Sequence, residues 1–163
     1  MKIGDTLPPV SVDVTPRTKP GADQLDLLSL KGHPLVLFFY PKDNTPGCTT
    51  EAQDFAKHYE EFKSTRTQIY GVSRDGLRSH NNFKTKLELP FDLISDPDES
   101  LCRHFGVIKL KKLYGKEHMG VERSTFLFDP SGKLIREWRG VKVKDHVAEV
   151  LEAVKGSTLV ENA

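Results

Sequence analysis

The sequence predicts an α/β fold, with a central mixed β-sheet flanked by helices and preceded by an N-terminal extension. Short apolar runs alternate with stretches of helical spacing, which is typical of strands joined by crossover helices. A late pair of strand-like segments surrounds a tight turn, so the sheet should be mixed and not purely parallel. The 163 residues contain no internal repeat and are enough for one domain with a sizeable core.

The first forty residues predict an extension followed by the central strand. Residues 1–32 are rich in proline, glycine and polar residues, but residues 10–14 alternate between apolar and polar, as in a half-buried strand near a sheet edge. Residues 15–23 contain two prolines and a glycine and predict an exposed loop. The run at 35–40 is entirely apolar, β-branched or aromatic, which favours a strand buried on both faces.

A helix is expected directly after this strand. Pro41 ends the strand, and residues 45–47 turn the chain into the next element. From Cys48 onward the apolar residues follow helical spacing on one face. These residues are Ala52, Phe55, Ala56, Tyr59 and Phe62.

The rest of the chain continues the alternation. Strands are expected at 69–73 and 91–94, helices at 76–88, 99–105 and 143–154, and a β-hairpin from the segments 124–128 and 134–138. The lysine-rich segment 109–116 is interpreted as a loop or short turn, for which a solvated segment is favoured over a binding patch; guidance of an anionic partner protein is the alternative. We expect one domain over residues 1–163, with residues 156–163 as a frayed tail.

Composition excludes several functional classes. The 24 basic and 23 acidic side chains give a net charge of +1, which provides no reason to expect nucleic acid or a membrane surface as a partner. No stretch approaches the ~20 apolar residues of a membrane helix. The N-terminus lacks a secretory signal, and two cysteines do not form a disulfide scaffold, so a cytoplasmic location with reduced thiols is expected.

Metal and cofactor motifs are also missing from the sequence. The six histidines are scattered and no cysteine pair joins them, so we expect no metal site. No glycine-rich nucleotide-binding motif follows a strand, and no cofactor is expected.

Cys48 is the main candidate for chemistry. It lies in the first turn of the predicted helix, just beyond the C-terminal end of a buried strand, where the sites of open α/β sheets gather. Free N–H groups and the helix dipole at such a position favour the thiolate, which is the nucleophilic form. A cysteine that merely packs in the core is the alternative. Pro41, Pro46 and Gly47 make a rigid turn that a packing cysteine does not need, and they favour the reactive interpretation.

The spacing Pro41-x-x-x-Thr45-x-x-Cys48 resembles the active-site motif of the peroxiredoxins. The longer string from Phe39 to Thr49 is similar to the branch called bacterioferritin comigratory protein, or peroxiredoxin Q. The resemblance covers nearly the whole chain, including residues 4–5, 105–107 and 122–126. It implies a thioredoxin-like fold.

The resemblance also implies roles for individual residues. Cys48 would be the peroxidatic cysteine, which attacks a peroxide oxygen and becomes a sulfenic acid. Thr45 would offer its hydroxyl to the peroxide, and Pro41 would shield the pocket from water. Arg123 would hold the thiolate and the peroxide, which agrees with the preference of an anion for a fixed guanidinium. Without the resemblance, Arg123 would be interpreted as a surface ion pair with Glu122 or Glu51.

Two departures from the family pattern concern the resolving cysteine. Many members of the branch carry it five residues after the peroxidatic one, where this chain has Gln53. Others carry it on the following helix, near Phe83 and Lys84. Only Cys102 remains, and a buried packing role is favoured for it over a resolving role. We therefore expect a one-cysteine cycle, with a Cys48–Cys102 disulfide cycle as the alternative.

The expected function is the reduction of hydrogen peroxide and organic hydroperoxides by the Cys48 thiolate. The expected reductant is an external thiol: a thioredoxin, a glutaredoxin or a small thiol. The resemblance suggests a monomer, although some relatives pair through the edge near the active site. A non-enzymatic redox sensor or holdase could use the same cysteine. A thioredoxin-type disulfide reductase is disfavoured, since the chain has no Cys-x-x-Cys pair.

Overall fold

The computed structural model describes the backbone of residues 1–162 and the side chains of residues 1–112 and 114–157. A seven-stranded sheet forms the centre of the molecule, in the order β2-β1-β5-β4-β3-β8-β9. Its strands are β1 (Ser11–Val14), β2 (Leu25–Asp26), β3 (Leu35–Phe39), β4 (Gln68–Ser73), β5 (Asp92–Ser95), β8 (Ser124–Phe128) and β9 (Leu134–Arg139). The helices are η1 (Leu27–Leu30, 3-10), α1 (Pro46–Lys57), α2 (Tyr59–Ser64), α3 (Leu77–Leu87), α4 (Ser100–His104) and α5 (His146–Asn162).

The sheet is mixed, as the sequence predicts. β3, β4 and β5 are parallel, whereas β8 pairs antiparallel with both β3 and β9. All five residues of β3 are buried, which confirms the prediction of a central strand covered on both faces. β1 lies second from one edge and pairs antiparallel with β5, which confirms the strand expected near the edge.

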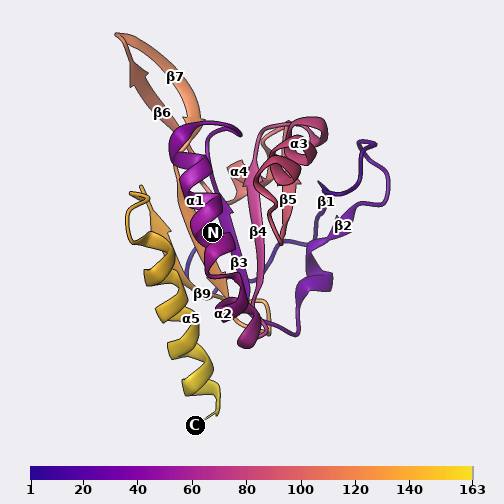
Figure 1. Ribbon diagram of the computed structural model, residues 1–163, viewed down its shortest axis with the longest axis vertical. Helices are drawn as coiled ribbons and strands as arrows, with labels where there is room; N and C mark the ends of the chain where they lie inside the picture. The colour runs from indigo at the N-terminus through magenta and orange to yellow at the C-terminus, as the bar shows by residue number, and fades with distance from the viewer. Residues whose placement is uncertain (163) are drawn as a thin grey trace.

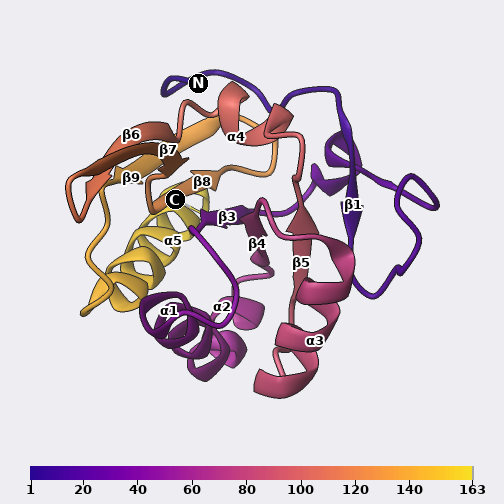
Figure 2. The ribbon, with the colours of Figure 1, turned by 90° about the horizontal axis from the view of Figure 1, so that it is seen from above.

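Two layers cover the sheet (Figures 1 and 2). Helices α1, α2, α3 and α5 pack on one face through an aromatic and aliphatic core that includes Phe38, Phe55 and Phe83. The N-terminal extension and α4 cover the other face, where Phe39 and Phe105 belong to a second core. Because β3 side chains alternate, its neighbouring phenylalanines Phe38 and Phe39 contribute to opposite cores.

The predicted helix after the central strand differs in its bounds. α1 begins two residues before Cys48, at Pro46, and a break at His58 separates it from α2. α5 begins at His146, three residues later than predicted, and its backbone is helical through Asn162. Among the described residues, no helix is long and apolar enough to cross a membrane.

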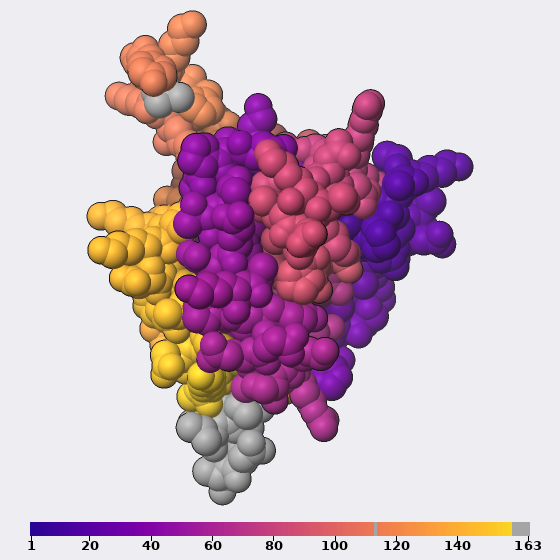
Figure 3. All heavy atoms as spheres, viewed as in Figure 1, coloured from indigo at the N-terminus to yellow at the C-terminus, as the bar shows by residue number. Residues whose placement is uncertain are grey.

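The prediction for segment 109–116 is wrong. It belongs to an antiparallel hairpin of β6 (Ile108–Leu113) and β7 (Lys116–Val121), which projects from the end of the sheet (Figures 1 and 3). The connecting residues Tyr114 and Gly115 both have positive φ, as a tight hairpin turn requires. Apolar residues and lysines alternate in β6 only as far as Lys111. Because the alternation breaks at Lys112 and half of the strand is lysine, the sequence pattern does not indicate a strand.

Candidate active site

Cys48 lies at the C-terminal edge of the sheet, as the sequence predicts. β3 ends at Phe39, a short loop follows, and Thr45 is the N-cap residue of α1. Pro46 therefore occupies the first helical position, where its missing N–H costs nothing, and Cys48 is the third residue of the helix. Backbone N–H groups of a first helical turn have no partner within the helix, so they favour an anion at this position. The side chain is only 2% exposed.

Arg123 reaches Cys48 because of the strand register. It lies between β7 and β8, and Ser124 at the start of β8 pairs with Phe39 at the end of β3. This pairing brings Arg123 to the first turn of α1, 75 residues away in sequence, where its Nη2 donates to Cys48 Sγ over 3.3 Å. Gly47 leaves room for this approach, because a Cβ at that position would lie 3.1 Å from Nη2.

Glu51 holds the other branch of the same guanidinium. Nη1 of Arg123 donates to Glu51 Oε1 over 2.7 Å, and the Glu51 side chain is fully buried, one helical turn after Cys48. The ion pair that the sequence left open as an alternative for Arg123 is thus present together with the contact to Cys48. Both belong to one buried cluster, and a guanidinium fixed at two points keeps its orientation.

The charges in this cluster influence one another. Burial raises the pKa of Glu51 to about 7, although Arg123 opposes the shift. Its second oxygen, Oε2, is buried and accepts no hydrogen bond from the described residues, which agrees with a costly ionisation. Burial lowers the pKa of the Arg123 guanidinium. The neighbouring Glu51 and Cys48 raise it by more, so the net shift of the pKa is upward.

Thr45 and Pro41 lie in the loop between β3 and α1, and both side chains are half-buried. The Thr45 hydroxyl donates to the carbonyl of Lys42 over 2.7 Å, which fixes its oxygen at the start of α1. A hydroxyl used in this way retains lone pairs that accept a hydrogen bond from a bound molecule.

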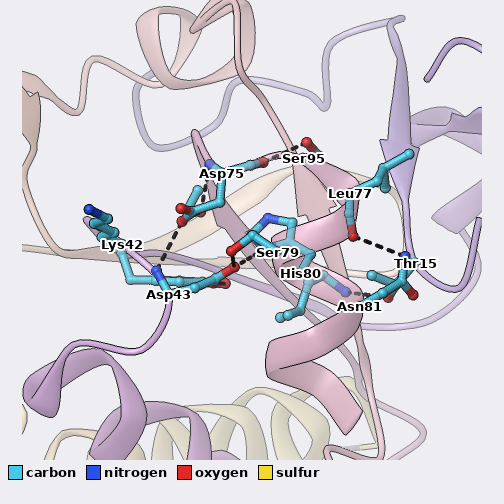
Figure 4. Close-up of polar contacts among 12 residues, drawn as sticks. Thr15, Lys42, Asp43, Asp75, Leu77, Ser79, His80, Asn81 and Ser95 are labelled. Carbon is cyan, nitrogen blue, oxygen red and sulfur yellow. Dashed lines mark hydrogen bonds and ion pairs between the residues drawn. The ribbon is translucent and has the colours of Figure 1, made fainter. Parts of the chain in front are cut away.

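A buried polar network anchors the same loop (Figure 4). The carboxylate of Asp43 accepts hydrogen bonds from Tyr40 and Ser79, each over 2.7 Å, and lies 2.8 Å from Nδ1 of His80. Nε2 of His80 lies 2.9 Å from the carbonyl of Ile94. Both ring nitrogens of His80 therefore face oxygen atoms, one on the Asp43 side chain and one on the backbone of β5. The network therefore ties the loop before Cys48 to α3.

The same network contains the one group of described residues that could hold a metal ion, namely Asp43, Asp75 and His80. Each already has partners within the protein. Asp75 Oδ2 accepts from the backbone N–H of Asp43 over 2.9 Å and from the hydroxyl of Ser73 over 2.6 Å. Asp43 and His80 were not singled out by the sequence, because they lie 37 residues apart and match no motif.

Cys102 lies in a different environment. It is fully buried on α4 and belongs to the core on the face of the sheet opposite to Cys48. Burial raises the pKa of the Cys102 thiol well above its ordinary value, and the neighbouring Asp96 carboxylate adds to the shift. A disulfide requires Cα atoms within about 7 Å, a geometry that two cysteines separated by a sheet do not offer.

A sulfur at a helix N-terminus beside a fixed guanidinium is suited to attack small oxidants, and the fold and site together define a thiol peroxidase. The model of the AhpC/TSA family matches residues 3–137. The chain belongs to this family, the peroxiredoxins, and within it to the bacterioferritin comigratory protein or peroxiredoxin Q branch.

Individual relatives agree in sequence and structure. Peroxiredoxin Bcp of Xanthomonas campestris pv. campestris is 50% identical over 149 residues, 91% of this chain and 92% of that protein. Peroxiredoxin Bcp of Bacillus subtilis is 54% identical over 133 residues, 82% and 85% of the two chains. A structure of the Xanthomonas campestris bacterioferritin comigratory protein, described for its alkyl peroxide reduction activity, superimposes with a TM-score of 0.83 at 46% identity, covering 91% and 92%. The chain is thus a peroxidase of the thioredoxin fold that uses peroxide as substrate and a thiol as reductant.

Proposed function

We propose that Cys48 is the peroxidatic residue, and that Arg123, Thr45 and Pro41 assist it. The observation that carries this assignment is the contact of 3.3 Å between Arg123 Nη2 and Cys48 Sγ in the first turn of α1. A guanidinium and free N–H groups stabilise the thiolate before the reaction. The same donors stabilise the negative charge that develops on the peroxide oxygens as they separate.

The first half of the proposed cycle oxidises Cys48. Its thiolate attacks one peroxide oxygen, the O–O bond breaks, and the departing oxygen takes a proton to leave as water or an alcohol. The second oxygen remains on sulfur as a sulfenic acid. The Thr45 hydroxyl lies at the start of α1 to orient the peroxide, and Pro41 limits the access of water. Hydrogen peroxide and organic hydroperoxides are the proposed substrates, which the alkyl peroxide reduction of the Xanthomonas relative supports.

The second half of the cycle uses an external thiol, either a thioredoxin, a glutaredoxin or a small thiol. Its thiolate attacks the Cys48 sulfur and releases water, which leaves a mixed disulfide. A second thiol then displaces Cys48 as thiolate and carries away the disulfide. Two observations support this route over a Cys48–Cys102 disulfide. The cysteines belong to cores on opposite faces of the sheet, and the pKa of the Cys102 thiol is strongly raised.

We further propose that the protein acts in the cytoplasm as a monomer, with neither nucleic acid nor a membrane as partner. A reduced compartment suits a resting thiolate. The balanced charge of the chain supports the absence of a polyanionic partner.

Repeated turnover tests the proposal. The purified protein is mixed with a large molar excess of hydrogen peroxide and with thioredoxin, glutaredoxin or dithiothreitol. The number of peroxide molecules consumed per enzyme molecule is then measured. Continued consumption with at least one thiol, lost in Cys48→Ser, is the expected result. Consumption of a single equivalent with every thiol would instead point to a sensor that reacts once and signals to a partner.

A further inference from the structure

The β6–β7 hairpin combines positive charge with exposed apolar side chains. We refer to residues 108–121 as the basic arm. Its four lysines and one glutamate give it a formal charge of +3, whereas the whole chain carries +1. Five large apolar side chains are notably exposed among the described residues, and three of them lie on the arm: Leu110, Tyr114 and Met119.

The arm has two different faces. Leu110 and Met119 pair across the strands. On the same face, the next pair towards the body is Ile108 and Val121; Val121 is buried in the core and Ile108 packs against it. The apolar side of the arm is therefore a continuation of the core into solvent. Lys109 and Lys111 point to the opposite side, because successive residues of a strand alternate.

The arm is joined directly to the active site. Val121 ends β7, and Arg123 follows two residues later. Lys111 donates to the carbonyl of Val121, and Arg74 reaches the carbonyl of Met119 over 3.4 Å. Burial lowers the pKa of Lys111, and the nearby charge of Arg123 lowers it further, so Lys111 lies close to the site. In Figures 1 and 3 the arm rises from the end of the molecule at which α1 begins.

We propose that the basic arm is the docking surface for the protein that reduces Cys48, and that this partner is a small acidic dithiol protein with an apolar rim around its reactive thiol. The inference rests on the proposed one-cysteine cycle. The sulfur of Cys48 lies in a residue that is only 2% exposed, so a macromolecular reductant must be held in place while its thiolate reaches that sulfur. Complementary charge next to the site increases the rate of such encounters, and exposed apolar side chains slow dissociation.

Lysines on an exposed hairpin also have a simpler use, since they discourage edge-to-edge aggregation. That role predicts no effect on the reductive step. It also does not account for the exposed leucine, methionine and tyrosine, which increase the risk of aggregation.

The test separates the two half-reactions. The arm variant is Lys109→Glu/Lys112→Glu/Lys116→Glu in the full chain, since these lysines are exposed. The matched control is Lys31→Glu/Lys63→Glu/Lys133→Glu, because these exposed lysines lie near the beginning of β3, on α2 and in the β8–β9 turn, away from Cys48. Stopped-flow experiments measure oxidation by hydrogen peroxide, and then reduction of the oxidised enzyme by an acidic thioredoxin or by dithiothreitol.

The arm variant should lower the second-order rate constant for reduction by thioredoxin about tenfold or more. Oxidation by hydrogen peroxide and reduction by dithiothreitol should stay within about twofold, as should all three rates in the control. Increasing the salt concentration should slow thioredoxin reduction of the wild type and not of the arm variant. A second variant, Leu110→Ser/Met119→Ser, should weaken thioredoxin reduction without removing its salt dependence.

Equal rate constants for reduction by thioredoxin in the wild type and the arm variant would overturn the docking role. The docking role would also be overturned if the arm variant slowed reduction by dithiothreitol as much as reduction by thioredoxin. Neither outcome affects the peroxidase cycle itself. That cycle fails only if no thiol supports turnover of the wild type.

Discussion

Cys48 and Cys102 are almost equally hidden from solvent, at 2% and 0% exposure, but they face opposite charges. Cys48 accepts a hydrogen bond from the guanidinium of Arg123 at a helix N-terminus. Cys102 lies beside Asp96, whose carboxylate accepts from the backbone N–H groups of Leu101 and Cys102. The helix N-terminus of α4 is thus already neutralised by a carboxylate, whereas that of α1 is left for a sulfur anion. Burial by itself therefore does not distinguish the two cysteines: Arg123 favours a thiolate at Cys48, whereas at Cys102 burial disfavours the thiolate and Asp96 adds to that effect.

Removing each sulfur should give the largest contrast. Cys48→Ser should reduce peroxide turnover by at least about 10⁴-fold, because the nucleophile is lost. Cys102→Ser should keep turnover within about twofold, since the Cys102 thiol is buried on the other face of the sheet. Steady-state consumption of hydrogen peroxide with dithiothreitol measures both. A comparable loss in the two variants would place Cys102 in the cycle and remove the distinction.

Arg123 and Arg139 lie on opposite faces of the sheet, and their replacement should have different effects on the oxidation of Cys48. Arg123→Met should slow the oxidation of Cys48 by about 10²–10³-fold, the usual effect of losing a donor aimed at developing charge. Arg139→Met is the matched control. The guanidinium of Arg139 lies on the face of the sheet opposite to Cys48, where it donates to the carbonyls of Phe105 and Gly106 and lies over the Phe126 ring. Single-turnover stopped-flow measures both rates. Nearly wild-type oxidation in Arg123→Met would contradict the assigned role of the guanidinium.

The pH dependence of stability should reveal the buried carboxylate near Cys48. The pKa of Glu51 is raised from 4.5 to about 7, so the folded protein binds this proton more tightly than the unfolded chain does. Protonation of Glu51 therefore adds to the free energy of unfolding. This added stability, on the order of 3 kcal/mol, is fully present below pH 4.5 and is lost as the pH rises through about 7.

Glu51→Gln removes this titration. Its stability relative to the wild type should therefore increase between pH 4.5 and pH 8 by the same amount. Urea unfolding at several pH values measures the difference in free energy of unfolding between the variant and the wild type. For the control Glu60→Gln, at an exposed position on α2, this difference should not change with pH. If the difference for Glu51→Gln were also independent of pH, Glu51 would ionise normally.

The smallest effect is expected on the Cys102 side. Asp96→Asn replaces the carboxylate that caps α4 and should cost about 1–2 kcal/mol of unfolding free energy. Burial is the main cause of the raised pKa of Cys102, so removal of the charge should not make the thiol reactive. Iodoacetamide labelling of the native variant should still modify Cys48 and not Cys102. Rapid labelling of Cys102 would show that Asp96, and not burial, keeps it inert.

The sequence was sufficient for six of the seven strands of the central sheet and for the position of Cys48, because both depend on local signals; the two-residue strand β2 was not predicted. An uninterrupted apolar run identified β3, and the prolines and glycine before Cys48 identified the turn into α1. The contact with Arg123 could not be derived locally. It depends on the antiparallel register of β8 against β3, and only the family resemblance indicated it.

Other parts of the site were missed for a similar reason. The Asp43–His80 pair joins a loop to a helix 37 residues later, and neither residue belongs to a recognisable motif. Within the β6–β7 hairpin, the segment 109–116 is predicted to be a loop because lysines replace apolar residues on an arm that the core does not cover. Sequence patterns report burial, and an exposed hairpin leaves only its turn residues as a signal.

The intact mass of the reduced protein after one equivalent of hydrogen peroxide distinguishes a sulfenic acid on Cys48 from a Cys48–Cys102 disulfide, with Cys48→Ser and Cys102→Ser measured alongside. We expect a gain of one oxygen in the wild type and in Cys102→Ser, and no gain in Cys48→Ser. A loss of two hydrogens that requires both cysteines would contradict the one-cysteine cycle, because Cys102 would then resolve the sulfenic acid across the sheet.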